Sequence, residues 1–156
     1  MVNIPHPFGG TPAFEALRRE GRILESLPFS FYYSPYLATI PRHYDPIAYY
    51  DCLIELFRHF TSPRMLARRL ATTRSPYVAL VHVTRTRVKR RRLGALRALR
   101  DGLRSDASLL AFHEGRTRRL PTLYRREYEA LLGPFAALMS AEESRPVLDA
   151  VPPIVA

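Results

Sequence analysis

The sequence predicts a mainly α protein, in which a short N-terminal extended segment is followed by about six or seven helices, with no substantial sheet. Apolar residues recur three and four positions apart through most of the chain, which is the spacing of one helix face. Several prolines stand where these patterns begin, namely Pro12, Pro46, Pro63 and Pro121, and Pro134 stands where one ends. With 156 residues, 47% apolar and 24% charged, the chain is long enough to bury a core.

Residues 1–12 are predicted to be extended, because their prolines do not permit a helix. A short helix is predicted over about 12–20. Thr11 is its expected N-cap, and Gly21 is its expected stop signal.

Residues 26–44 form an aromatic, proline-rich connection in which three prolines interrupt any regular element. The rings of this stretch belong to Phe29, Phe31, Tyr32, Tyr33, Tyr36 and Tyr44. We expect such a connection to lie against a surface and to pack its rings there.

Two helices follow this connection. Asp45 is the expected cap and Pro46 the first residue of the clearest one, which continues to Phe60. Ser62 and Pro63 are expected to begin the second.

Residues 76–88 are ambiguous. Their valines and threonines, in a period of two, favour a strand. However, the sequence offers no neighbouring strand, and an isolated strand is unstable, so we favour a helix here. From Lys89 to Leu103 a stripe of leucines predicts a helix.

Two further helices are predicted before the C-terminal tail. One begins at Ser105 or Asp106 and ends near Gly115. The other runs over 121–132 and stops at Gly133-Pro134.

Cysteine and hydropathy exclude several classes of protein. Cys52 is the one cysteine, so an internal disulfide is excluded, as is a zinc or iron–sulfur site that needs several thiolates from this chain. No apolar run reaches the roughly 18 residues of a membrane helix, and the N-terminus lacks the pattern of a secretory signal. We therefore expect a cytoplasmic protein without a membrane span.

Basic residues exceed acidic ones by 24 to 14, which gives a formal net charge of +10. Most of the excess positive charge lies in residues 85–104, which contain nine basic residues and one acidic residue, Asp101. They are Arg85, Arg87, Lys89, Arg90, Arg91, Arg92, Arg97, Arg100 and Arg104. Binding to nucleic-acid phosphates is one interpretation and a solvated face is the other. Tyr77 and Phe112 flank the block, and 23 of the 24 cations are arginine, a bias that a GC-rich genome also produces.

Candidate ligand groups are few. Cys52, Glu55 and His59 share a predicted helix face and together offer donors that suit a metal. We favour the alternative of a half-buried cysteine beside a surface Glu–His pair. The other histidines, which show no ligand spacing, are His6, His43, His82 and His113. The stretch Gly9-Gly10-Thr11 precedes a helix, so it is either an anion site or, as we favour, an ordinary turn and cap.

The N-terminal stretch carries a resemblance to a known family. From Pro5 it reads Pro-His-Pro-Phe-Gly-Gly-Thr-Pro-Ala-Phe-Glu, and Glu20-Gly21-Arg22 follows. This resembles the segment after the catalytic barrel of cobalamin-binding-type radical S-adenosylmethionine (radical SAM) enzymes, in which a strand ends in a Pro-Gly-Thr-Pro turn and a helix ending in Glu-Gly-Arg. Residues 41–63 look like the next piece of these enzymes, and residues 112–135 are similar to the helical tails of some members. Gly9 stands where the family usually has proline.

The resemblance implies that this chain is the C-terminal accessory portion of a larger radical SAM enzyme. That family holds a 4Fe–4S cluster through a CxxxCxxC motif, and the cluster binds S-adenosylmethionine, with cobalamin as an optional further cofactor. This chain has only Cys52, so we expect it to bind no cofactor by itself. No catalytic, cofactor-binding or metal-binding residue carries over.

The resemblance also implies partners and a division of the chain. The partners are the remainder of the barrel and a small-molecule substrate of the whole enzyme, and Asn3 to His6 would lie nearest the cofactor. The four implied segments are the end of a barrel strand with a turn and short helix (1–24), the aromatic connection (25–44), a helical domain (45–139) and a loose tail (140–156). The alternative function is a small free-standing basic helical protein that binds RNA or DNA through Arg85–Arg104.

Overall fold

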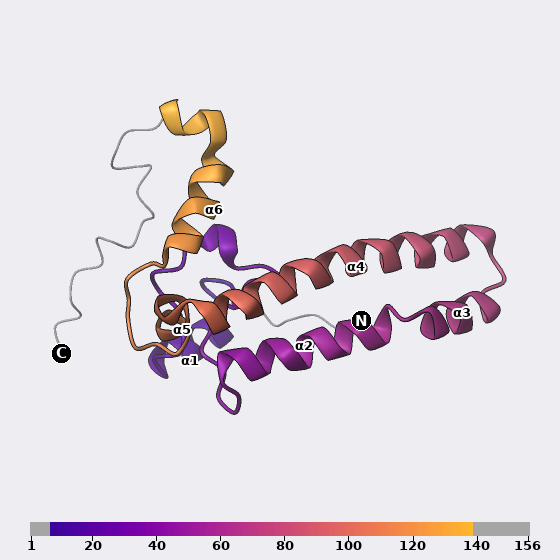
Figure 1. Cartoon of the computed structure of the whole chain (residues 1–156), viewed down its shortest axis with the longest axis horizontal. Helices are drawn as coiled ribbons and strands as arrows, with labels where there is room; N and C mark the ends of the chain where they lie inside the picture. Colours follow the sequence, from indigo (N-terminus) through magenta and orange to yellow (C-terminus); the bar gives the residue numbers. More distant parts are fainter. Residues whose placement is uncertain (1–6, 139–156) are drawn as a thin grey trace. The chain divides into compact units, whose positions relative to one another are not determined.

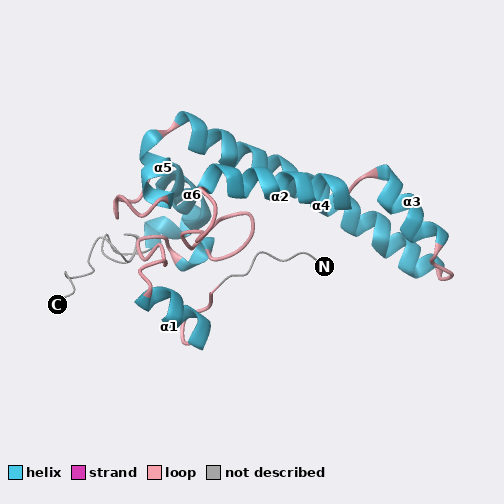
Figure 2. Ribbon diagram, turned by 90° about the horizontal axis from the view of Figure 1, so that it is seen from below, coloured by secondary structure: helices cyan, strands magenta, loops and turns pink. Residues whose placement is uncertain are grey.

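The computed structural model describes residues 7–138, and these residues are mainly helical, as predicted (Figures 1 and 2). They contain six α-helices and two short 3₁₀ helices, and their only β pairing is an isolated antiparallel bridge between Ile23 and Thr39. Asn3 to His6 and the predicted loose tail lie outside the described residues.

The chain separates into two compact units. The first, here called the aromatic unit, combines the residues up to His43 with those from Asp106 onward. The second, here called the basic unit, is the continuous stretch Tyr44–Ser105. The division inferred from the resemblance, at residues 24, 44 and 139, stays a prediction.

The aromatic unit begins with α1 (Pro12–Arg19). Thr11 caps α1 by accepting a hydrogen bond from the Phe14 N–H, and Pro12 occupies the first helical position, as predicted. The 3₁₀ helix η1 (Phe29–Phe31) follows within the aromatic connection. The other elements are α5 (Ala107–His113), α6 (Thr122–Leu132) and η2 (Gly133–Leu138).

The aromatic connection is only partly packed. Phe31 and Tyr32 are buried, whereas Phe29, Tyr33 and Tyr44 are exposed. The buried apolar residues of the aromatic unit are Ile23, Leu24, Leu27, Phe31, Tyr32, Leu37, Ala38, Leu109, Phe112, Leu120 and Tyr124. The core of this unit therefore joins the aromatic connection to α5 and α6, elements that are distant in sequence.

The basic unit consists of α2 (Pro46–Phe60), α3 (Pro63–Ala71) and α4 (Pro76–Ser105). Both α2 and α3 pack along α4, which is the longest helix described (Figures 1 and 2). Asp45 and Ser62 cap α2 and α3 through their side chains, as predicted. The buried apolar residues are Tyr50, Leu53, Ile54 and Phe57 of α2, and Leu96, Leu99 and Leu103 of α4.

The ambiguous residues 76–88 are helical and continue without a break into the leucine-stripe segment. The valines and threonines that favour a strand are accommodated in one 30-residue helix. Thr86 is buried, and its hydroxyl donates to the His82 carbonyl at 2.8 Å, which satisfies the hydroxyl inside the helix. Local strand propensity is thus outweighed here, where residues 76–88 form the first part of a helix that packs against α3 and α2.

Of the two predicted caps for the next helix, α5, the structure uses Asp106 and not Ser105. The Asp106 carboxylate accepts from the N–H groups of Ser108 and Leu109, at 2.8 and 3.2 Å. Ser105 instead ends α4, where its hydroxyl donates back to the Asp101 carbonyl at 3.0 Å. The carboxylate at Asp106 is the stronger acceptor at a helix N-terminus.

Candidate functional site

The turn that carries the N-terminal resemblance is closed by its own hydrogen bonds. The Thr11 hydroxyl donates to the Phe8 carbonyl at 2.7 Å, and the Thr11 N–H points to the same carbonyl at 3.2 Å. Gly10 has φ +79°, a conformation that favours glycine. The stretch is therefore built as a turn and cap, which is the interpretation favoured over an anion site.

The Glu20-Gly21-Arg22 sequence forms a clasp between the end of α1 and the aromatic connection. Gly21 has φ +66° and lets the chain reverse after α1. The Arg22 guanidinium donates to the Ile40 carbonyl at 3.0 Å and pairs with the Glu20 carboxylate at 3.0 Å. The Ile40 N–H donates to the Arg22 carbonyl at 2.8 Å, so the two segments are held by both backbone and side chain.

A buried polar pair lies at the centre of the aromatic unit. His113 Nε2 and the Tyr124 hydroxyl are 2.7 Å apart, and both side chains are almost fully buried. The Tyr124 ring lies 5.3 Å from the Phe31 ring and 6.0 Å from the Phe112 ring, centroid to centroid. Burial lowers the pKa of His113 to about 4, so the imidazole is neutral at pH 7.

Sequence reasoning missed this pair, because it considered His113 only as a metal ligand. A usable signal is present: His113 follows Leu109 and Phe112 at four and one positions, on the apolar face of α5. A histidine on such a face is expected to be buried and to require a hydrogen-bond partner.

A cavity of about 190 Å³ opens in the aromatic unit beside the clasp. It is lined by Ile40, Phe112 and Glu25, and Glu25 pairs with Arg18, which also lines it, at 3.3 Å. Gly115 also lines it, with φ +73°, and a Cβ there would lie 2.5 Å from Ile40 Cδ1. The cavity is smaller than the roughly 300 Å³ at which pockets for drug-sized ligands begin.

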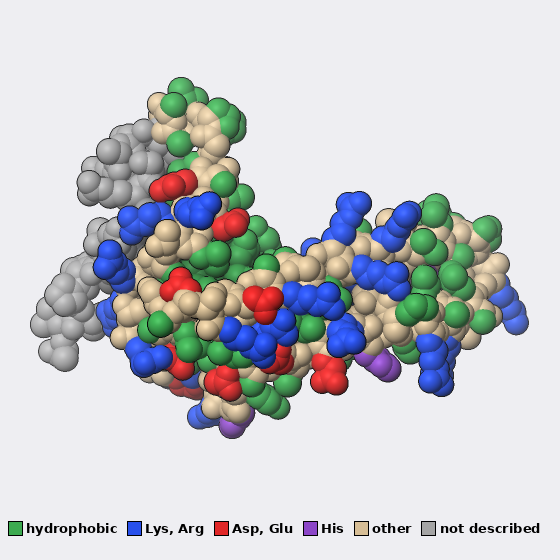
Figure 3. Space-filling model, in the orientation of Figure 1, with side chains coloured by type: hydrophobic (Ala, Val, Ile, Leu, Met, Phe, Trp, Pro, Cys, Tyr) green, Lys and Arg blue, Asp and Glu red, His purple; other side chains and the backbone are tan. Residues whose placement is uncertain are grey.

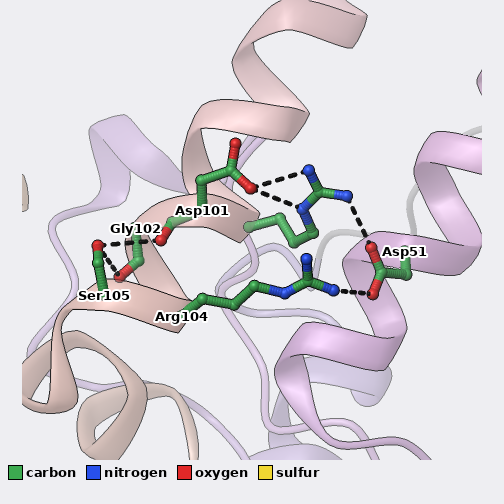
Figure 4. Close-up of polar contacts among 6 residues, drawn as sticks. Asp51, Asp101, Gly102, Arg104 and Ser105 are labelled. Carbon is green, nitrogen blue, oxygen red and sulfur yellow. Dashed lines mark hydrogen bonds and ion pairs between the residues drawn. The ribbon is translucent and has the colours of Figure 1, made fainter.

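The arginine block lies on one helix, α4, but its cations differ in their contacts. Arg90 donates to the Thr61 carbonyl at the C-terminal end of α2, at 2.9 and 3.1 Å. Arg100 and Arg104 both pair with Asp51 of α2, at 3.0 and 2.8 Å (Figure 4). These three arginines fasten α2 to α4.

The other six cations of the block form no ion pair or side-chain hydrogen bond within residues 7–138. They are Arg85, Arg87, Lys89, Arg91, Arg92 and Arg97. All except Lys89 are exposed. The block is thus divided between a structural group and a solvent-facing group.

The charge excess belongs to the basic unit. Residues 44–105 contain 14 basic and 4 acidic residues, whereas the rest of the chain contains 10 of each. Residues 56–100 contain 13 basic residues and no acidic one. On the face shown in Figure 3, basic and hydrophobic side chains lie next to one another over α3 and the first half of α4.

The candidate metal ligands on α2 are not assembled into a site. Cys52, Glu55 and His59 are all exposed, and residues 7–138 hold no group of three His, Cys, Asp or Glu side chains placed to bind a metal ion. The prediction that Cys52 is half-buried is wrong, because α2 buries the next two residues, Leu53 and Ile54, and leaves Cys52 in solvent.

Comparison with protein-family models, with curated proteins and with solved structures found no match to this chain. No helix in the described part of the chain is both long and apolar enough to cross a membrane.

Proposed function

We propose that this chain is the C-terminal helical accessory portion of a radical SAM enzyme. Its own role is structural: it closes the end of the catalytic barrel and contributes no catalytic residue. The observation that carries the proposal is the clasp, in which Gly21 of the family-like sequence lets the chain reverse and Arg22 bonds to Ile40 of the aromatic connection. Residues that carry the resemblance thus also hold two segments of this chain together.

The whole enzyme supplies the chemistry in this proposal. A 4Fe–4S cluster in the barrel binds S-adenosylmethionine, and cobalamin is an optional further cofactor. The accessory portion helps to shape the opening for a small-molecule substrate, and the exposed rings of Phe29 and Tyr33 are available for that role. Exposed rings are suited to contact a substrate or the barrel edge.

Reading the DNA upstream of the Met1 codon tests the proposal. We expect the frame to continue without a stop and to encode CxxxCxxC before Asn3. The protein from the complete frame, purified without oxygen, should then cleave S-adenosylmethionine reductively. A variant with the three motif cysteines changed to alanine is the control and should not. An in-frame stop immediately upstream would overturn the proposal.

A second candidate function is binding of RNA or DNA through Arg85–Arg104. The observation in its favour is that six of the nine cations in this block have no protein partner in the described residues, and that residues 56–100, which include all six, contain no acidic residue. Binding through phosphates weakens steeply as salt is raised, because counterions are released. A salt titration with an oligonucleotide tests this candidate, and absent or salt-independent binding would contradict it.

A further inference from the structure

The outer face of α4 combines apolar and basic side chains. Tyr77, Leu80 and Val88 are 74%, 63% and 48% exposed, although each is large and apolar enough to favour burial. Arg87 and Arg91 are exposed on the same helix. Helical spacing of three and four residues places Tyr77, Leu80, Thr84, Arg87, Val88 and Arg91 in one row, here called the outer stripe.

The outer stripe belongs to a part of the basic unit with little core of its own. α3 contains no buried residue, and α4 contains none before Thr86. Exposed apolar side chains that gather in this way mark surfaces that contact another molecule. The nearest acidic residues along the chain are Glu55 and Asp101, so a partner meets cations without competing carboxylates from α3 or this part of α4.

The mixture of apolar and basic side chains in the outer stripe indicates the chemical class of its partner. A helix that lies on a membrane separates its apolar face from its basic face. The outer stripe instead carries both kinds of side chain on one face, with Val88 between Arg87 and Arg91 along the helix. Single-stranded nucleic acid offers a matching mixture of groups, because its phosphates need cations and its unpaired bases need rings and apolar surfaces.

We propose that the outer stripe of α4 binds single-stranded nucleic acid, with Arg87 and Arg91 on phosphates and Tyr77 stacked on a base. The proposal rests on the second candidate function and adds to it a strand preference and a stacking residue. Of the two rings that flank the arginine block, only Tyr77 can take this role, since Phe112 is 1% exposed. Tyr77 and Arg87 are ten residues apart on one helix, or about 15 Å.

Fluorescence anisotropy with the 156-residue chain tests the stacking residue. The probes are a labelled single-stranded oligouridylate, a single-stranded DNA of equal length and an RNA duplex of equal length. We expect Tyr77→Ala to weaken single-strand binding about tenfold, the size of one lost stacking contact, and Tyr77→Phe to retain it. Tyr44→Ala, which removes another exposed ring from the basic unit, is the control and should leave binding unchanged.

The cations need a matched pair of variants. Arg87→Gln with Arg91→Gln should reduce the slope of log affinity against log salt by roughly 1.4, since each single-strand phosphate contributes about 0.7. Arg125→Gln with Arg126→Gln removes the same charge from exposed positions on α6 and should not change the slope. Circular dichroism of each variant excludes loss of fold.

The outcomes separate this inference from the function on which it rests. Steeply salt-dependent binding that is equal for duplex and single strand, and unaffected by Tyr77→Ala, overturns the inference and leaves the second candidate function standing. Absence of binding to every oligonucleotide at low salt overturns both. Binding to phosphatidylserine vesicles without binding to oligonucleotides also overturns both and assigns the stripe to a membrane surface. A preference for RNA over DNA, or the reverse, identifies which single strand the supported site takes.

Discussion

The two units of the chain use their side chains in opposite ways. The aromatic unit has equal numbers of acidic and basic residues in its sequence and buries large rings, with Phe31, Phe112 and His113 around Tyr124. The basic unit has the whole charge excess, and leaves Tyr77 and Leu80 in solvent. The first is built as a core around an internal polar pair, and the second leaves part of its apolar surface exposed.

This difference predicts which property a substitution should change in each unit. Removing a buried ring leaves a cavity and costs several kcal/mol, whereas removing an exposed one costs little. The aromatic unit should therefore respond through stability, and the outer stripe of the basic unit should respond through binding. Variants of the same residue type in the two units make this contrast measurable.

The largest expected effect is that of Tyr124→Ala. Tyr124 is fully buried against Phe31 and Phe112, so its removal should lower the free energy of unfolding by about 3–5 kcal/mol. Tyr77→Ala makes the same chemical change at a 74% exposed position and should alter it by no more than about 0.5 kcal/mol. Urea unfolding followed by circular dichroism measures both, and equal costs would remove the contrast between the units.

The next effect is a loss of stability at acid pH that depends on His113. In the unfolded chain a histidine binds a proton below about pH 6.5, but burial lowers the pKa of folded His113 to about 4. Between these values the unfolded state binds more protons, so stability falls as the pH is lowered through this window. The full loss, reached below pH 4, is about 3 kcal/mol.

Urea unfolding of the wild type and of His113→Gln at pH 7, 5.5 and 4.5 measures this loss. We expect the variant to start less stable at pH 7, because Tyr124 loses the imidazole, and to lose less stability on acidification. His43→Gln, an exposed histidine of the same unit, is the matched control. Parallel pH profiles for wild type and His113→Gln would show that His113 does not cause the acid loss.

Helix ends were predictable from the sequence, because their signals are local. Thr11, Asp45 and Ser62 cap the helices for which they were proposed, and each is followed by a proline at the first helical position. The choice of helix for residues 76–88 was also right, since it used the absence of a pairing strand rather than propensity alone.

The buried and exposed side chains were less predictable, because they depend on contacts between distant segments. The His113–Tyr124 pair joins two helices, and neither residue type by itself indicates a hydrogen-bond partner eleven positions away. Similarly, the arginine block reads as uniform along the chain, but Asp51 and the Thr61 carbonyl on α2 engage Arg100, Arg104 and Arg90 and leave the others free of described partners. Only the fold separates structural arginines from those available to a ligand.

The smallest expected effect comes from a pair of glycine substitutions, one in each unit. Gly115 has φ +73°, and its new Cβ would lie 2.5 Å from Ile40 Cδ1, so Gly115→Ala combines backbone strain with overpacking. We expect it to lower the free energy of unfolding by about 1–3 kcal/mol.

Gly94 lies within α4 with no atom within 4 Å of a new Cβ, so Gly94→Ala should raise the free energy of unfolding by about 0.5–1 kcal/mol through helix propensity. Urea unfolding of the two variants gives opposite signs if Gly115 is required by its conformation and Gly94 is not. A stabilised Gly115→Ala would mean that the turn after α5 and the neighbouring Ile40 adjust at no cost, and that the positive φ at position 115 does not require glycine.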